Sequence, residues 1–206
     1  MNSINFEAAF VNVALLWMLT VPHEFAHAWT AVRLGDDTPE REGRVSLNPM
    51  AHVDWLGTVI LPALTSLFGG GFLGWGKAVN TNPYRLRWGL NGLALVALAG
   101  PASNVVFALL LGLLTVLLHG TLPAVAEFTG RGVYLSLYLA MFNMIPVPPL
   151  DGSKLLLAAR APVAVYNELA RFGFVLLIVA ISVSSLGRYL SLWSFQGTQV
   201  ILRMFW

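Results

Sequence analysis

Residues 8–33 read AAFVNVALLWMLTVPHEFAHAWTAVR, and this stretch decides the fold class. It is long enough for a membrane-spanning helix, which needs about 20 mostly apolar residues. Glu24 is its only acidic residue, and no Lys or Arg occurs in it before Arg33. The preceding residues, 1–7, lack the basic region of a secretory signal. We therefore predict a retained transmembrane helix over Ala8–Arg33.

The composition of the whole chain also indicates a membrane protein. Hydrophobic residues make up 57% of its 206 residues and charged residues 11%, whereas soluble domains carry about 25% charged residues. The mean hydropathy is +0.71. The net charge of +2 is too small to indicate nucleic-acid binding, so no nucleic-acid partner is expected. Because cysteine is absent, disulfides are excluded, and a soft metal has to be bound by His and carboxylates.

Further apolar stretches follow along the chain. Three are interpreted as spans, and they are Leu90–Leu118, Val133–Pro146 and Val163–Leu186. Leu56–Trp75 is also apolar, but it contains Pro62 and three successive glycines at 69–71, so a short helix, a re-entrant segment and a full span are all open. The tail, residues 188–206, is aromatic and partly polar, a composition favoured in the membrane interface.

These stretches predict an all-α polytopic membrane protein, a bundle of about four to six transmembrane helices. Between the first and second clear spans we expect a re-entrant or short β-hairpin element. No internal repeat or second soluble domain is evident in the sequence. Residues 1–206 are therefore predicted to form a single membrane-embedded domain.

Membrane orientation follows from the Lys and Arg residues near the ends of the spans. If Leu56–Trp75 is re-entrant, most of these residues fall on one side, namely Arg33, Arg41, Arg44, Lys77, Arg85, Arg87, Lys154 and Arg160. The other side receives Arg131, Arg188 and Arg203. We prefer this interpretation, and it predicts a multi-pass protein of the cell membrane with the larger group in the cytoplasm. A full span over Leu56–Trp75 would weaken the bias.

Residues His23-Glu24-Phe25-Ala26-His27 form the H-E-x-x-H pattern. Residues four apart on a helix lie on one face about 5–6 Å apart, so both imidazoles can reach one tetrahedral zinc ion. Zinc lowers the pKa of a bound water toward about 7, and Glu24 can take a proton from such a water and return one to a leaving amine. Accidental packing is the weaker alternative, because ionisable groups inside a membrane are costly and indicate function.

A catalytic zinc usually has three protein ligands and one open position, so a third ligand is needed. Asp151 follows three prolines, Pro146, Pro148 and Pro149, which cannot continue a helix. Non-helical backbone at membrane depth is tolerated where it lines protein or a water-filled cavity, and a carboxylate there suits zinc. The alternative is that Asp151 caps a helix beginning near Ser153, because Asp is a good N-cap. The need for a third ligand favours the zinc role.

Of the two remaining histidines, only His52 is a candidate site residue. His52 and Asp54 form a second His and carboxylate pair in the polar segment before Leu56. They are either alternative metal ligands or residues that line the site, although solvated or capping roles are more common for such loop residues. His119 ends a span beside Gly120 and is interpreted as interfacial.

Asn104 lies in Gly100-Pro101-Ala102-Ser103-Asn104, near the start of the second clear span. A buried Asn in a membrane often holds helices together. Alternatively, it donates a hydrogen bond to a substrate carbonyl or its oxyanion. Gly100 and Pro101 suggest close packing or the start of a helix.

Taken together, three motifs resemble those of the site-2 protease family of intramembrane zinc metalloproteases. In chain order they are His23-Glu24-x-x-His27, Gly100-Pro101-x-x-Asn104 and Asn143-x-x-Pro146-x-Pro148-x-Leu150-Asp151-Gly152. A lone H-E-x-x-H pattern is moderately specific, whereas all three motifs in this order on apolar helices are highly specific. The resemblance covers Leu16–Leu157, most of the chain.

The resemblance implies a zinc metalloendopeptidase with one Zn²⁺ per chain, bound by His23, His27 and Asp151, and with Glu24 as the general base. It implies cleavage of a peptide bond within or near a membrane-spanning segment. The expected partners are therefore a transmembrane protein or peptide substrate and the lipid bilayer, with the active site toward the cytoplasm. A role in substrate binding or oxyanion stabilisation is implied for two amides, those of Asn104 and Asn143.

Residues 44–54 and 74–83 look like those of a compact bacterial branch of the family. The chain has no room for a PDZ domain and lacks a CBS extension, so regulation by such domains is not expected. An intact substrate helix hides its carbonyls in backbone hydrogen bonds, and cleavage requires local unwinding. We hypothesise that residues 44–48 or 75–81 hold the unwound peptide by β-augmentation, with Val79→Pro as a test.

Two alternatives come from other functional classes. A membrane metal-binding or transport protein using the same ligands would carry paired acidic residues along more than one span, and these are absent. A catalytically silent member of the family, acting as a binding module, usually lacks the Glu, whereas Glu24 is present. The sequence therefore favours the peptidase.

Overall fold

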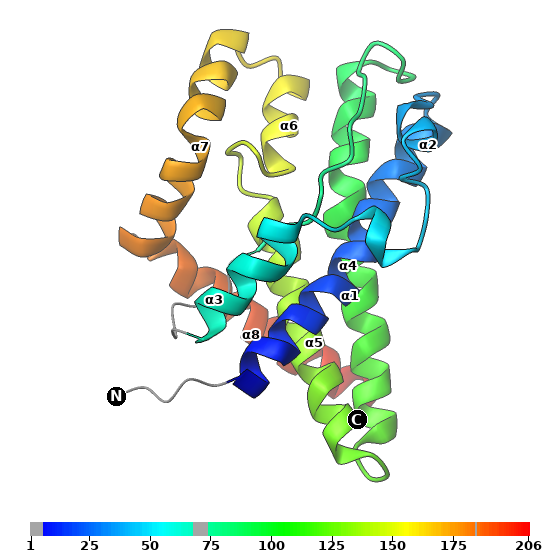
Figure 1. The fold of residues 1–206 in the computed structure, drawn as a ribbon, viewed down its shortest axis with the longest axis vertical. Helices are drawn as coiled ribbons and strands as arrows, with labels where there is room; N and C mark the ends of the chain where they lie inside the picture. Colours follow the sequence, from blue (N-terminus) through cyan, green and yellow to red (C-terminus); the bar gives the residue numbers. More distant parts are fainter. Residues whose placement is uncertain (1–5, 68–73, 184) are drawn as a thin grey trace.

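The computed structural model describes residues 6–67, 74–183 and 185–206 (Figure 1). In chain order these residues form α1 (Phe6–Arg33), α2 (Thr38–Arg41), η1 (Pro49–Ala51), η2 (Trp55–Ile60), α3 (Leu61–Leu67), α4 (Leu90–Leu118), α5 (Pro123–Asn143), α6 (Gly152–Ala158), α7 (Val163–Val183) and α8 (Leu186–Phe205). The predicted all-α class is confirmed. The β-hairpin offered as one form of the element between the first two clear spans is not supported, because the described residues contain no strand.

Three of the described helices are long and apolar enough to cross a membrane, judged by length and composition. They are α1 over Ala9–Arg33, α4 over Leu90–Leu118 and α7 over Val163–Ile181. The bounds of α4 are those predicted from the sequence. Large apolar side chains such as Leu110 on α4 and Val175 on α7 are exposed. Extended apolar surfaces of this kind indicate contact with lipid or protein, in agreement with a membrane protein.

The third predicted span, Val133–Pro146, belongs to a longer helix. α5 begins at Pro123, because proline is favoured in the first turn of a helix. Residues 123–132, which precede the predicted span, are therefore helical as well. Glu127 and Arg131 form an exposed i,i+4 ion pair of 2.6 Å, which supports the helix. Their charges also lower the mean hydropathy of α5, which is not among the three helices apolar enough to span.

The central packing unit consists of α1, α4 and α5, with α8 lying against α4 and α5 (Figure 1). Its core is an apolar cluster contributed by these four helices, and its buried members are Leu15, Leu16, Leu19, Ala108, Leu111, Val133, Leu135, Leu139 and Ile201. On α8 the buried positions Leu190, Ser194, Thr198 and Ile201 recur at helical spacing, so one face of the tail packs on the bundle. The predicted interfacial location of this tail stays a prediction.

The apolar stretch from residue 56 to residue 75 begins and ends at the same place in the fold. The Trp75 amide donates to the Gly57 carbonyl at 2.9 Å, and the Thr58 hydroxyl donates to the Trp75 carbonyl at 2.9 Å. Two residues later, the Lys77 amide donates to the His52 carbonyl at 2.9 Å. The two ends thus lie side by side, as the re-entrant interpretation requires and a full span forbids. Glycines 69–71 lie outside the described residues.

Candidate active site

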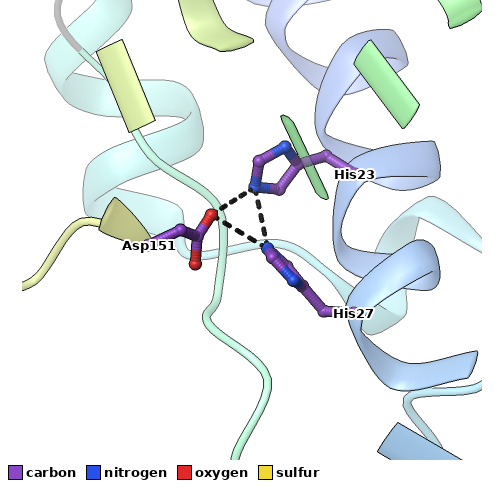
Figure 2. A group of neighbouring side chains, drawn as sticks. All are labelled: His23, His27 and Asp151. Atoms are coloured by element: carbon purple, nitrogen blue, oxygen red, sulfur yellow. Dashed lines mark hydrogen bonds and ion pairs between the residues drawn. The ribbon is translucent and has the colours of Figure 1, made fainter. Parts of the chain in front are cut away.

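Helix α1 carries three of the predicted site residues within five consecutive positions, and the two histidines among them contact α4. His23, Glu24 and His27 are all buried, with 6%, 7% and 3% of their surfaces exposed. Because His23 and His27 are one helical turn apart, their rings lie on the same side of α1, with centroids 4.7 Å apart (Figure 2). Two imidazoles and a carboxylate are thereby held within an otherwise apolar helix.

Asp151 reaches the same point from a distant part of the chain. α5 ends at Asn143, and the prolines at 146, 148 and 149 prevent helix formation until α6 begins at Gly152. The Oδ2 atom of Asp151 lies 3.1 Å from Nε2 of His23 and 2.9 Å from Nε2 of His27 (Figure 2). The side chain makes no capping hydrogen bond to α6, so the alternative capping role is not realised.

The protonation of His27 is determined by its contact with α4. The Val96 carbonyl can only accept, so Nδ1 of His27 donates to it at 2.7 Å. In a neutral imidazole Nε2 then carries a lone pair, which faces Oδ2 of Asp151 at 2.9 Å. Two buried acceptors at this distance repel unless a proton or a cation lies beside them. A ligand His fixed by a backbone carbonyl on its other ring nitrogen is characteristic of metal sites.

The spacing of the donor atoms fits a zinc ion. A tetrahedral zinc with bonds of about 2.0–2.1 Å separates its ligand atoms by about 3.3 Å. Here Nε2 of His23, Nε2 of His27 and Oδ2 of Asp151 are 2.9–3.1 Å apart. Among the described residues no other cluster of His and acidic side chains could hold a metal. Three protein ligands would leave one zinc position open, as in catalytic sites.

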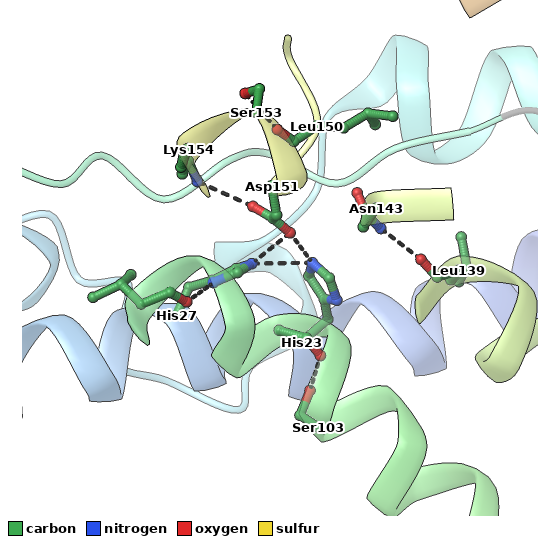
Figure 3. A network of polar contacts seen from close by, with 11 residues as sticks. His23, His27, Ser103, Leu139, Asn143, Leu150, Asp151, Ser153 and Lys154 are labelled. Carbon is green, nitrogen blue, oxygen red and sulfur yellow. Dashed lines mark hydrogen bonds and ion pairs between the residues drawn. The ribbon is translucent and has the colours of Figure 1, made fainter. Parts of the chain in front are cut away.

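The charge state of Asp151 also suits a metal ligand. Lys154 donates from Nζ to Oδ1 at 3.0 Å (Figure 3). Asp151 is therefore ionised, which is the state in which a carboxylate binds a metal.

A cavity of about 450 Å³ adjoins the three candidate ligands. Its wall combines polar groups, among them Glu24, Asp54, Asn104, Asn143 and Lys154, with apolar side chains from several elements. The apolar part includes Leu16, Leu19, Trp75, Leu139, Phe142 and Phe174. This combination of an apolar wall and a few convergent polar groups is typical of a substrate site.

The two predicted amides occupy different positions in this wall. Asn104 is 1% exposed, and neither its Oδ1 nor its Nδ2 has a hydrogen-bond partner among the described residues. Asn143 donates one N–H of Nδ2 to the Leu139 carbonyl at 3.0 Å (Figure 3), which leaves its Oδ1 and its second N–H available. A buried amide without partners is costly, and a bound substrate would relieve that cost at Asn104.

His52, Asp54 and His119 lie outside the ligand cluster. His52 is buried, but it is not part of the cavity wall, and its Nε2 is 2.7 Å from the Ser46 carbonyl. Burial lowers the pKa of His52, although the hydrogen bond to Ser46 opposes this. Asp54 accepts from the Gly57 amide at 2.8 Å and thereby caps η2. His119 is exposed and contacts the Trp206 ring at 5.1 Å. Asp54 thus lines the cavity, and the site-lining role of His52 stays a prediction.

Two glycines allow the backbone to approach the site residues closely. A Cβ atom on Gly100 would lie 2.3 Å from Nε2 of His27 and 2.7 Å from Cε1 of His23. A Cβ atom on Gly76 would lie 2.2 Å from Cγ2 of Thr20 and 3.2 Å from Oε1 of Glu24. Sequence reasoning anticipated close packing at Gly100 but overlooked Gly76. The glycines on both sides of Trp75, Gly74 and Gly76, were the sequence signal that could have indicated close packing there.

Similarity to curated proteins extends over most of the chain. It is 33% identical over 195 residues to the "Putative zinc metalloprotease YwhC" of Bacillus subtilis, which covers 89% of this chain and 85% of that protein. It is 31% identical over 195 residues to the "Putative zinc metalloprotease Rip2" of Mycolicibacterium smegmatis, with 90% and 72% covered. A Rip2 protein of Mycobacterium tuberculosis is 34% identical over 152 residues, with 71% and 56% covered.

The names of these relatives indicate zinc as the metal and a protease as the class of enzyme. Both agree with the His-His-Asp cluster built by α1 and the start of α6. No protein-family model matches the chain. No solved structure matches it.

Proposed function

The chain belongs to the site-2 protease family, and from this premise we propose that it is an intramembrane zinc metalloendopeptidase. Its substrates would be membrane proteins, cleaved at peptide bonds within or near their transmembrane segments. One observation carries the proposal: Nε2 of His23, Nε2 of His27 and Oδ2 of Asp151 converge beside Glu24 in a buried cavity among apolar helices.

In this proposal His23, His27 and Asp151 hold one zinc ion, which supplies the Lewis acidity that activates water for attack on a peptide carbonyl. Glu24 is the general base, because it lies next to His23 and faces the same cavity. Its Oε2 atom has no hydrogen-bond partner among the described residues and is free to accept a proton. The same carboxyl then returns a proton to the leaving amine.

The amides of Asn104 and Asn143 are proposed to bind the substrate or to stabilise the oxyanion. Asn104 suits this role best, because its Nδ2 is buried, adjoins the cavity and lacks a partner among the described residues. A donor aimed at developing negative charge in a water-poor site contributes strongly to catalysis. Asn143 contributes through Oδ1, which can accept from a substrate amide.

The extended segment 74–79 is the proposed docking edge for an unwound substrate. Trp75 and Lys77 have their amides and carbonyls engaged on one side, by Gly57, Thr58, His52 and Arg44. Successive residues of an extended chain present their backbone groups to alternate sides. The amides and carbonyls of Gly76 and Ala78 have no hydrogen-bond partners among the described residues, and both residues line the cavity. An extended substrate can pair there by β-augmentation.

Replacing Ala78 by Pro tests this edge more directly than Val79→Pro, because the Val79 side chain is buried and its replacement also removes packing. Ala78→Pro removes one free amide and is expected to lower kcat/KM for a transmembrane substrate by about 2- to 12-fold, the worth of one hydrogen bond. Cleavage would be measured in proteoliposomes. The control is Ala78→Ser, which keeps the amide. Equal activity of both variants at unchanged zinc content would remove segment 74–79 as the docking edge.

The location and extent of the protein are proposed on the same basis. The larger of the two groups of Lys and Arg residues defined from the sequence lies near the span ends on one side of the membrane and around the re-entrant segment. Because such residues are enriched in cytoplasmic loops, this supports a cell-membrane protein with its active site toward the cytoplasm. The ligands come from α1 and from the start of α6, which supports one metalloprotease domain over residues 1–206. Cysteine substitution at Arg41 and Arg131, followed by labelling with an impermeant maleimide in intact cells, tests the orientation.

The metal site is tested by zinc content and by Asp151→Ala. The wild-type protein, purified in detergent, is expected to bind one zinc per chain. Asp151→Ala removes one of three ligands and leaves Lys154 without its ionic partner, so zinc affinity is expected to fall by at least about 10–100-fold. Chelator competition gives the affinity, and circular dichroism checks the fold. A folded wild-type protein without zinc, or undiminished affinity in Asp151→Ala, would contradict the assignment.

A further inference from the structure

The two carboxylate oxygens of Asp151 have different partners. Oδ2 lies 3.1 Å from Nε2 of His23 and 2.9 Å from Nε2 of His27. Oδ1 accepts a hydrogen bond from Nζ of Lys154 at 3.0 Å. In Figure 3 the ammonium and the two imidazoles approach the carboxylate from different sides. The side chain of Asp151 is therefore held at both oxygens, and only Oδ2 is presented to the two imidazoles.

Lys154 is built into the same turn as the candidate ligand. It lies three residues after Asp151, in the first turn of α6, so the contact is an i,i+3 pair, a spacing at which helical side chains meet. Its side chain is 24% exposed and that of Asp151 is 9% exposed. Among the described residues, no other Lys or Arg forms an ion pair with Asp151. Among the described residues, Lys154 is thus the one Lys or Arg that contacts this carboxylate, and it does so at Oδ1.

A carboxylate can bind a metal through one oxygen or through both. Catalytic zinc sites keep one position open besides three protein ligands, and a second carboxylate oxygen would compete for that position. A hydrogen bond to Oδ1 opposes this competition, because the oxygen is already engaged. Partners of metal-binding carboxylates orient the ligand, and their loss typically costs about 10–100-fold in metal affinity or activity.

We propose that Lys154 is a positioning residue that holds Asp151 as a one-oxygen ligand, with Oδ2 directed at His23 and His27 and Oδ1 kept away from the metal. The inference rests on the proposed function, because it presupposes a metal at the three donor atoms. It adds a residue that sequence reasoning counted only as a charge for membrane orientation. Lys154 acts through Asp151 and is not itself a ligand.

The alternative role for Lys154 is to bind the substrate, because its side chain also lines the cavity. A substrate-binding cation would raise KM when removed and leave the metal unaffected. A positioning residue would change zinc affinity and the coordination of the metal without any substrate present. Measurements on the metal alone therefore separate the two roles.

The test compares Lys154→Met, Lys154→Arg and the control Arg160→Met in the full-length protein. Arg160 follows the end of α6 and is exposed, so its replacement removes one cation near the same helix without touching Asp151. Lys154→Met is expected to bind zinc about 10–100-fold more weakly in chelator competition. Lys154→Arg retains a donor and is expected to recover most of that loss, and Arg160→Met is expected to match the wild type.

Cobalt provides the second measurement, because zinc itself is spectroscopically silent. The visible absorption of Co²⁺ reports coordination number, and in Lys154→Met it is expected to weaken as Oδ1 is released toward the metal. Unchanged zinc affinity and an unchanged cobalt spectrum in Lys154→Met would overturn the proposal, and a raised KM alone would assign Lys154 to the substrate. If Lys154→Met does not fold, Lys154→Leu, which also lacks a donor, is judged by the same criteria.

Failure of this inference is distinguishable from failure of the proposed function. If the wild type binds zinc and cleaves a transmembrane substrate while Lys154→Met keeps its zinc affinity, only the role of Lys154 is wrong. If the folded wild type binds neither zinc nor cobalt, the metal site itself is wrong and the inference falls with it.

Discussion

Glu24→Gln is expected to lower cleavage of a transmembrane substrate by about 10²–10⁴-fold, the usual contribution of general acid–base catalysis. The substitution keeps the size of the side chain but removes its ability to accept a proton. Glu24 is 7% exposed and its Oε2 has no partner among the described residues, so its carboxylate is free to accept a proton, which the Gln amide cannot do. Cleavage of a fluorogenic transmembrane peptide in proteoliposomes measures the effect.

Zinc content is the control for Glu24→Gln, because Glu24 is not one of the three converging donors. The variant is expected to retain one zinc per chain and to bind the uncleaved substrate. A folded variant that holds zinc and still cleaves at the wild-type rate would exclude Glu24 as the base. Loss of zinc together with activity would instead place Glu24 among the groups that form the metal site.

Gly100→Ala is expected to weaken zinc binding strongly, although residue 100 is not a ligand. The added Cβ would lie 2.3 Å from Nε2 of His27, the atom directed at the metal, and 2.7 Å from Cε1 of His23. Overpacking of a well-packed site costs about 1–3 kcal/mol. Because the steric conflict falls on the imidazoles themselves, we expect about a 5- to 150-fold loss of zinc affinity, and cleavage to fall in parallel.

Gly130→Ala is the matched control for this second prediction. A Cβ atom on Gly130 would lie 3.6 Å from Cγ2 of Thr115, an ordinary contact in the α4–α5 packing. Gly130→Ala is therefore expected to bind zinc like the wild type. Zinc affinity by chelator competition and thermal unfolding should be measured on both variants. Equal zinc affinity in folded Gly100→Ala and Gly130→Ala would show that close packing of α4 at Gly100 does not position the histidines.

Much of the fold was predictable because the signals were local. The apolar run at 90–118 gives α4 its bounds, and the H-E-x-x-H spacing on a helix brings His23 and His27 to one side of α1. The ends of Leu56–Trp75 meet, as the charge distribution favoured. The prediction of Asp151 required one further argument, the need for a third ligand, and its side chain does reach the two imidazoles.

The remaining features depend on contacts that no local pattern contains. The start of α5 was placed ten residues late, because Glu127 and Arg131 interrupt the apolar run although the helix continues through them. The roles of Val96 and Gly76 arise from tertiary contacts, with α1 at Val96 and with Thr20 and Glu24 at Gly76. His52, one of a His and carboxylate pair that could line the site, has its Nε2 2.7 Å from the Ser46 carbonyl, a contact that no local pattern indicates.

The distance along the chain between the candidate ligands has a consequence for biosynthesis. His23 and Asp151 are 128 positions apart, and α4 and α5 lie between them in the sequence. During synthesis the N-terminal part of a protein folds first, so the nascent chain inserts α1 with two histidines and a carboxylate long before the last donor is made. A nascent chain that ends before residue 151 lacks the third donor, so the three-donor centre cannot form until most of the chain has been made.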